Sequence, residues 1–380
     1  MTNTDQRALT QAERRDWLRL IRSENVGPVT FHRLVERYGS AGAAIEALPE
    51  LARRGGRAKP ILVASKASAE AEIAAHERNG AVLIASVEPG YPAAMRGLDD
   101  APPLLSVYGN AHLLTRPAVA VVGARNASVN GRRIAQGIAA ELGQAGLLVV
   151  SGMARGIDTA AHEGVLAGEA PGATAAVMAG GVDHIYPPEN DDLYRRIVAQ
   201  GVAVSEMPPG TVPQASHFPR RNRIISGISL GVVVVEASPR SGSLITARLA
   251  LEQGREVFAV PGSPLDPRCA GPNGLIRQGA TLTETADDVL AVLADMLRRP
   301  AVEARPAKGF GGSAPPCDDE KAVAAARSMV VEGLGPAPVA VDEIIRRCQL
   351  SPAVVSTVLL ELELAGRLER HPGHRVSLLG

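Results

Sequence analysis

Residues 118–128 (AVAVVGARNAS) and 147–158 (LLVVSGMARGID) each place a short apolar run directly before a polar turn that contains glycine. Four further apolar runs follow before residue 261, and helical stretches separate them. Near-continuous apolar strands that alternate with helices are typical of a parallel sheet covered on both faces. We therefore predict an α/β fold whose core is a parallel sheet. The expected strands are 118–123, 147–151, 174–179, 203–206, 230–237 and 256–260, and the expected helices are 131–145, 159–167, 192–200, 219–227 and 244–253.

Polar or glycine-rich turns follow the carboxyl ends of these strands, at residues 123–126, 151–158, 179–181 and 238–243. Open parallel sheets bind ligands in the crevice outside those ends. We expect the four turns to converge on one side of the sheet. The first turn does not match the dinucleotide fingerprint GxGxxG, and the chain has no Walker A sequence GxxxxGK[ST]. No cofactor is expected.

The second turn, SGMARGID, has the composition of a phosphate-binding turn. Gly152 and Gly156 permit backbone conformations that direct several N–H groups at one oxyanion, and Ser151 adds a hydroxyl donor. Asp158 suits the N-cap of the helix that follows. Arg155 inside the turn favours phosphate binding over a purely structural turn.

The stretch 217–223, HFPRRNR, combines an aromatic ring, three guanidinium groups and an amide. Proline is favoured at the first helical position, so we expect Pro219 to open a helix with His217 and Phe218 extended before it. Arginine binds phosphate oxygens, and an adjacent ring can stack on a base. The sequence therefore predicts a site for single-stranded nucleic acid. The alternative is a solvated basic helix start with Phe218 packed into a core.

Charge around this stretch supports the nucleic-acid interpretation. Residues 216–255 contain six arginines and two glutamates, a net charge of +4, whereas the formal net charge of the whole chain is +0. A local excess of positive charge is what a nucleic-acid site requires. Aromatic residues make up only 3% of the chain, so a phenylalanine beside three arginines is an uncommon feature.

Composition bounds the class of protein. A chain of 380 residues suggests two or three domains, and 46% hydrophobic with 21% charged residues is ordinary for a globular protein. Cys269, Cys317 and Cys348 are far apart, which indicates a reducing compartment and no zinc or other metal site. The N-terminus has no apolar signal region, and no run reaches the length of about 18 apolar residues that a membrane span needs. We expect a cytoplasmic protein that does not contact the membrane.

Two smaller modules flank the core. Residues 12–48 read as helices around the turn 25–28 (NVGP), a pattern that resembles a SAM-like or helix-hairpin-helix module. The nucleic-acid-binding version of this module holds a phosphate on hairpin N–H groups, but we favour a packing role here. Residues 102–107 read as a connection into the core. The predicted divisions are an N-terminal helical module at 1–80, the core at 81–299, a flexible linker at 300–317 and a winged helix at 318–380.

The predicted winged helix has an acidic recognition helix. Glu361 and Glu363 lie in that helix, and carboxylates in a DNA groove are repelled by phosphate. We therefore expect a protein-contact or structural role, with only the wing from Arg367 to Arg375 able to touch a DNA backbone.

Together these blocks resemble the DprA/Smf family of bacterial DNA-processing proteins. The matching text is VVGARNAS, SGMARGIDTAAHEGVL, AVMAGGVDHIYPPEN, SEMPPG, HFPRRNRIISG and EASPRSGSLITARLALEQGREVFAVPG. The resemblance implies that the parallel sheet is an extended Rossmann-like core. It also implies a homodimer that binds and protects single-stranded DNA and helps to load the RecA recombinase during natural transformation. It also implies DNA contacts by Arg125, the 151–156 turn and the 218–223 segment, without fixing which guanidinium acts where. The full predicted nucleic-acid site is Arg125, Ser151, Gly152, Arg155, Gly156, His217, Phe218, Arg220, Arg221, Asn222, Arg223 and Arg240.

The competing function is a nucleotide-processing enzyme with a lysine-decarboxylase-like Rossmann fold. In that interpretation Glu236, at a strand end, is the general base. The glycine-rich pattern PGGxGTxxE expected there is replaced by EASPRSGS, and neither His162 nor His217 has an evident nucleophile partner. We therefore favour a binding protein that is not an enzyme.

Overall fold

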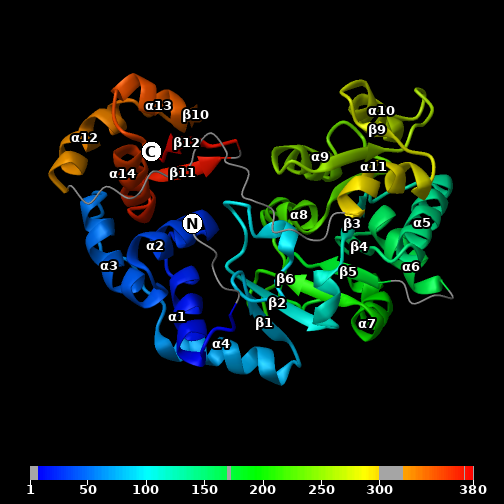
Figure 1. The fold of residues 1–380 in the computed structure, drawn as a ribbon, viewed down its shortest axis with the longest axis horizontal. Helices are drawn as coiled ribbons and strands as arrows, with labels where there is room; N and C mark the ends of the chain where they lie inside the picture. Colours follow the sequence, from blue (N-terminus) through cyan, green and yellow to red (C-terminus); the bar gives the residue numbers. More distant parts are fainter. Residues whose placement is uncertain (1–6, 169–172, 299–319, 372, 380) are drawn as a thin grey trace. The chain divides into compact units, whose positions relative to one another are not determined.

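A computed structural model describes residues 7–168, 173–298, 320–371 and 373–379 (Figure 1). Their contacts divide them into two compact units. One contains the described residues of 72–298, and the other contains residues 9–71 together with the described residues from 320 onward. The predicted linker at 300–317 lies outside the described residues.

The larger unit is built on a nine-stranded sheet of order β1-β2-β6-β5-β4-β3-β7-β8-β9. All six predicted strands are present, and each pairs in parallel with its neighbours among the six. The predicted α/β class with a parallel-dominated sheet is confirmed. These strands are β3 (Ala118–Val122), β4 (Leu148–Ser151), β5 (Ala173–Val177), β6 (Val202–Ser205), β7 (Gly231–Val234) and β8 (Glu256–Ala259).

Three further strands extend the sheet at its edges. Residues 102–107 were expected to form a connection, and that expectation is wrong, because β2 (Leu104–Gly109) lies there and pairs antiparallel with β6. Its run LLSVYG is buried at its first four positions, which is the burial pattern of a strand inside a sheet. β1 (Val82–Ala85) pairs antiparallel with β2, and β9 (Thr281–Leu282) pairs in parallel with β8.

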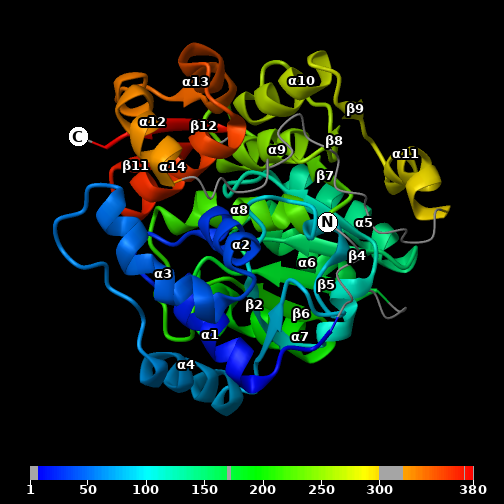
Figure 2. The same ribbon diagram turned by 60° about the vertical axis from the view of Figure 1, so that its left-hand side comes forward.

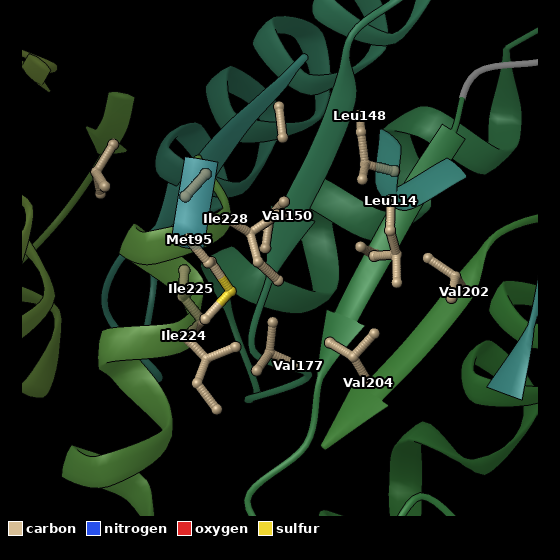
Figure 3. Packing of buried hydrophobic residues seen from close by; sticks show 14 of the residues in the cluster. Met95, Leu114, Leu148, Val150, Val177, Val202, Val204, Ile224, Ile225 and Ile228 are labelled. Carbon is tan, nitrogen blue, oxygen red and sulfur yellow. The ribbon is translucent and has the colours of Figure 1, made fainter. Parts of the chain in front are cut away.

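Side chains on the strands alternate between two apolar layers. Ala118, Ala120 and Val122 of β3 face one layer, and Val119 and Val121 face the other. The first layer is closed by α8 (His217–Ile228) and α9 (Gly242–Glu252), and the second by α5 (Val129–Gln144), α6 (Ile157–Ala167) and α11 (Ala286–Arg298). Figure 3 shows isoleucines of α8 and Met95 packed over valines of β4, β5 and β6. The larger unit also contains α7 (Asp191–Gln200) and α10 (Ala270–Arg277). Helix α4 (Lys66–Arg78) belongs to it from Glu72 onward.

The smaller unit contains the predicted helical module and the predicted winged helix. The module consists of α1 (Gln11–Ile21), α2 (Pro28–Tyr38) and α3 (Ala41–Arg54). The winged helix contains α12 (Glu320–Glu332), α13 (Val341–Cys348) and α14 (Pro352–Leu364), which Figure 2 shows grouped with β11 and β12. Its sheet has the order β10-β12-β11. Its strands are β10 (Val339–Ala340), β11 (Leu368–His371) and β12 (Arg375–Leu378).

Helix α14, the recognition helix of the winged helix, packs against α3. A Cβ atom added at Gly55, which caps α3, would lie 1.9 Å from the carbonyl oxygen of Glu361. Arg367 Nη1 donates to Gly55 O at 3.3 Å. Asn25, in the hairpin between α1 and α2, donates through Nδ2 to Leu364 O at 3.1 Å. The recognition helix therefore makes intramolecular contacts, as its acidic composition led us to expect.

Glu361 of the recognition helix has no exposed carboxylate to offer a ligand. Its side chain is 2% exposed and accepts from Arg327 Nη2 at 2.5 Å. Glu363 accepts from Arg370 Nε at 2.7 Å, so that arginine of the wing is also engaged.

In the part of the chain that the structure describes, no helix is long and apolar enough to cross a membrane.

Candidate nucleic-acid interface

The structure brings three of the predicted connections together at the carboxyl end of the sheet. Arg125 follows β3, the 151–156 turn follows β4, and Phe218 lies in the first turn of α8. Arg125 Cζ lies 5.2 Å from the centroid of the Phe218 ring, and Arg221 Cζ lies 6.0 Å from it. Both distances are within the range of cation–π interaction. We call this arrangement the Phe218 crevice.

A second aromatic ring, absent from the predicted site, borders the Phe218 crevice. The centroid of Tyr186 lies 5.6 Å from that of Phe218, with the planes inclined at 59°, and Tyr186 is 42% exposed. The sequence offered one indication of this ring: a tyrosine shortly after a predicted strand, in a chain with only 3% aromatic residues.

Hydrogen bonds hold the loop that carries Tyr186. The carboxylate of Asp183 accepts from the backbone N–H of Gly210 at 2.8 and 2.9 Å and from Asn79 Nδ2 at 3.2 Å. A small hollow beside the two rings is lined by Gly152, Gly180 and His184 among others.

Arg221 lies under the 151–156 turn and is 5% exposed. Its Nη1 donates to Gly152 O and to Val177 O, both at 2.5 Å. Burial lowers the pKa of Arg221 to about 10, with Asp158 acting in the opposite direction, so the group stays charged at neutral pH. A Cβ atom at Gly152 would lie 2.3 Å from Arg221 Nη1, which explains the glycine. Arg221 therefore supports the turn from beneath.

Asp158 binds the same turn from inside. Its carboxylate accepts from Gly152 N at 3.1 Å and from Ala154 N at 3.4 Å, and burial raises its pKa. The N-cap of α6 is Gly156, with φ of 81°, so the prediction that Asp158 caps this helix is wrong. Ser151 is fully buried and donates to Val121 O at 2.7 Å, so its hydroxyl is engaged within the fold. Arg155 is the exposed charge of the turn, with Nε 3.3 Å from Glu189 Oε1.

Helix α8 begins two residues earlier than predicted. His217 and Phe218 are its first two residues and Pro219 the third, so the expected extended conformation of His217 and Phe218 is wrong. Proline is tolerated there because N–H groups in the first helical turn have no partner within the helix. His217 is half-buried, and its Nδ1 accepts from Gln214 N at 3.3 Å.

The basic residues of α8 divide between protein and solvent. Asn222 Nδ2 donates to Gly242 O at 3.3 Å, and Arg223 is paired with Glu206 and with the carbonyl of Asp100. Arg220 is exposed. Together with Arg125, Arg155 and Arg240, it gives the predicted site four exposed guanidinium groups.

Glu236 fills the position where the strand order reverses, between β3 and β7. It accepts from Ser128 N at 2.8 Å and from Ser128 Oγ at 2.5 Å, and Gly131 N donates to the same Ser128 Oγ. A Cβ atom at Gly131 would lie 2.5 Å from the carboxyl carbon of Glu236. Glu236 thus holds the start of α5, at the position where many folds of this class bind a nucleotide.

Family models match three segments of the chain. DNA recombination-mediator protein A matches residues 82–294, the DprA-like N-terminal HHH domain matches 11–75, and the DprA winged helix domain matches 314–374. The chain belongs to the DprA/Smf family. The predicted resemblance is therefore confirmed.

Relatives of this family share most of the chain. Protein Smf of Escherichia coli is 38% identical over 323 residues, which cover 85% of this chain and 84% of the relative. The X-ray structure of DprA from Streptococcus pneumoniae has a TM-score of 0.62 and 35% identity, covering 75% of this chain and 98% of that one. A structure of DprA from Helicobacter pylori, reported for its single-stranded DNA binding mode, has a TM-score of 0.51 and 28% identity, covering 57% and 96%.

Proposed function

We propose that this DprA/Smf family member binds single-stranded DNA in the Phe218 crevice. The observation that carries the proposal is the exposed guanidinium of Arg125 lying 5.2 Å from the centroid of the half-buried Phe218 ring. The pair offers what a single strand requires, a charge for a phosphate and a ring face for an unpaired base. The single-stranded DNA binding mode reported for the Helicobacter pylori relative supports the same assignment.

The surroundings suggest a division of roles among the predicted residues. Arg125, Arg155, Arg220 and Arg240 are exposed and would contact phosphates. Phe218 and Tyr186 would stack on bases. The other members of this set with hydrogen bonds to protein groups would hold the turn and the helix that carry these contacts. They are the buried Ser151, Gly152, Arg221 and Asn222 and the half-buried Arg223.

The same arrangement predicts a preference for single strands over duplex. Phosphate contacts by arginine are available to both forms, whereas a base can stack on a protein ring only when it is unpaired. Stacking does not depend on which base is present, so binding should be tolerant of sequence.

We further propose that the bound strand is protected and passed to the RecA recombinase during natural transformation, and that the protein acts as a cytoplasmic homodimer. Membership of the DprA/Smf family supports this assignment. The enzyme alternative loses support because Glu236, its proposed general base, is engaged by Ser128.

Fluorescence anisotropy with labelled oligothymidylate, and with a duplex of equal length, tests the proposal. The intact protein should bind the single strand much more tightly. Phe218→Leu keeps an apolar side chain but removes the ring, so it should weaken single-strand binding by on the order of 1–3 kcal/mol, while Phe218→Trp should retain binding.

Leu251→Ala on α9 is the matched control, because Leu251 is an exposed apolar side chain whose loss should leave affinity unchanged. Equal affinity for duplex and single strand, or full binding by Phe218→Leu, would place the DNA site elsewhere.

A further inference from the structure

An open groove of about 580 Å³ lies between α5 and α6, outside the Phe218 crevice. Arg132, Arg133 and Gln136 line it from α5, and Gly156, Thr159 and Glu163 line it from α6. Its volume is within the range of ligand sites in proteins, and neither helix places an aromatic ring in it. We call it the α5–α6 groove.

Small residues of α6 shape the groove. Gly156, Ala160 and Gly164 recur every four residues and therefore lie along one face of the helix. At Gly164 the helices touch, because a Cβ atom there would lie 2.3 Å from the carbonyl oxygen of Gln136. Gly156 and Ala160 line the groove itself, where a larger side chain would occupy the space.

The charges in the groove are not balanced by protein groups. Arg132 and Arg133 are exposed, and neither guanidinium group has a hydrogen bond or ion pair within the described ranges of the chain. They are the fourth and fifth residues of α5, whose first turn contains no acidic residue. Cations near the positive end of a helix dipole are unfavourable for helix stability. An anion in the groove would relieve this repulsion.

The carboxylate that lines the groove does not neutralise these arginines by direct pairing. Glu163 Oε2 accepts from Gln136 Nε2 at 3.2 Å. Glu163 and Gln136 thus engage each other on the wall, and the two guanidinium groups remain available to a ligand.

The groove is contiguous with the turn that carries Arg125. Gly156 lines the groove, and a Cβ atom added at Gly156 would lie 2.5 Å from the carbonyl oxygen of Arg125. The side chain of Arg125 in turn lies against the Phe218 ring. Arg125 therefore connects the two sites, with its carbonyl against the groove wall and its side chain against the Phe218 ring.

We propose that the α5–α6 groove binds the sugar–phosphate backbone of the same single strand beyond the Phe218 crevice, with Arg132 and Arg133 each contacting a phosphate. This inference rests on the proposed function. Since no ring lines the groove, the contact is to backbone and is independent of base identity.

Salt titrations with two lengths of oligothymidylate test this inference. One oligonucleotide, of about five nucleotides, fills only the crevice, and one of about twenty extends through the groove, given site sizes of about 4–16 nucleotides in comparable proteins. For Arg132→Ala/Arg133→Ala, the slope of log K against log salt should become shallower by about 1.4 with the long strand, at about 0.7 per lost contact. Binding of the short strand should be unchanged.

The matched control is Arg195→Ala/Arg196→Ala, which removes two adjacent exposed arginines from α7. It should leave both slopes unchanged, and thermal unfolding should show all variants folded. The groove assignment is overturned if the groove variant keeps the wild-type slope with the long strand, weakens both lengths equally, or is matched by the control. If Phe218→Leu, made in the otherwise unchanged protein, bound single strands as tightly as the wild type, the proposed crevice would be overturned instead.

Discussion

The guanidinium carbon of Arg125 lies 5.2 Å from the centroid of the Phe218 ring, although the two residues follow different strands of the sheet. Parallel pairing of β3 with β4, of β4 with β5 and of β5 with β6 brings these connections to one edge. The contact allows charge and stacking to be separated experimentally, because one partner carries charge and the other does not.

We predict that Arg125→Ala and Phe218→Ala weaken single-strand binding in different ways. Removing Arg125 should make the slope of log K against log salt shallower by about 0.7, because one phosphate contact is lost. Removing the Phe218 ring should lower affinity by on the order of 1–3 kcal/mol with little change in slope. Salt titration of both variants against oligothymidylate measures the two effects, and the reverse pattern would contradict the assignment.

We predict that Arg221→Ala acts mainly on folding. It removes the donor to Gly152 O and Val177 O, and it removes the buried positive charge that acts on the buried Asp158 carboxylate. Loss of one partner of a buried charged pair destabilises by about 3–5 kcal/mol. Urea unfolding should show this loss, whereas Arg220→Ala, one residue earlier and exposed, should unfold like the wild type.

The sequence did not predict that Arg220 is exposed and Arg221 is buried. The HFPRRNR segment placed a basic, aromatic helix start at the site, and the parallel sheet placed that start beside Arg125. Which guanidinium faces solvent depends on the rotation of α8 about its own axis. That rotation is set by the isoleucines of α8, which pack against one face of the sheet. That packing places Arg221 inward beneath the Gly152 turn and leaves Arg220 outward.

The 151–156 turn was recognised as a glycine turn, but its internal bonding was not. Ser151 was expected to donate to a phosphate and Asp158 to cap the following helix, and both side chains instead hold the turn. Similarly, the acidic recognition helix was expected to contact protein. Its partner, α3, lies about 300 residues earlier in the chain, as the bond from Arg367 to the carbonyl of Gly55 at the end of α3 illustrates, and no local pattern specifies such a contact.

We predict that His162 makes folding sensitive to acid. The ring is fully buried, its Nδ1 lies 2.7 Å from Thr174 Oγ1, and burial lowers its pKa to about 3. The unfolded chain binds this proton near pH 6.5, so stability is present above that pH and falls as the pH decreases towards 3, by at most about 1.4 kcal/mol per pH unit. His162→Gln should flatten the dependence in urea unfolding. His112→Gln, at an exposed site, should leave it unchanged.

We predict that the winged helix is dispensable for binding single strands. The residues assigned to the Phe218 crevice and to the α5–α6 groove all belong to the larger unit. A chain that ends at Arg299 should therefore bind long oligothymidylate within a few-fold of the intact protein. A hundredfold loss on truncation would show that the winged helix contributes directly to the DNA site.

Gly55 tests whether the contact between α3 and the recognition helix α14 stabilises the protein. Its backbone φ of −68° suits any residue, so the obstacle to a side chain is steric: the added Cβ atom would lie 1.9 Å from the Glu361 carbonyl oxygen and 2.8 Å from the Ala365 Cβ atom. Gly55→Ala should force the helices apart and destabilise the smaller unit by about 1–3 kcal/mol, as overpacking typically does.

Gly42→Ala is the control within the same helix, because the nearest atom to its added Cβ is Asp16 Oδ2 at 3.5 Å, an ordinary contact. Glycine to alanine inside a helix should stabilise by about 0.4–1 kcal/mol. Denaturant unfolding of both variants compares the two. If Gly55→Ala unfolds like Gly42→Ala, the winged helix does not pack on α3 in solution, and the recognition helix is free to contact another molecule.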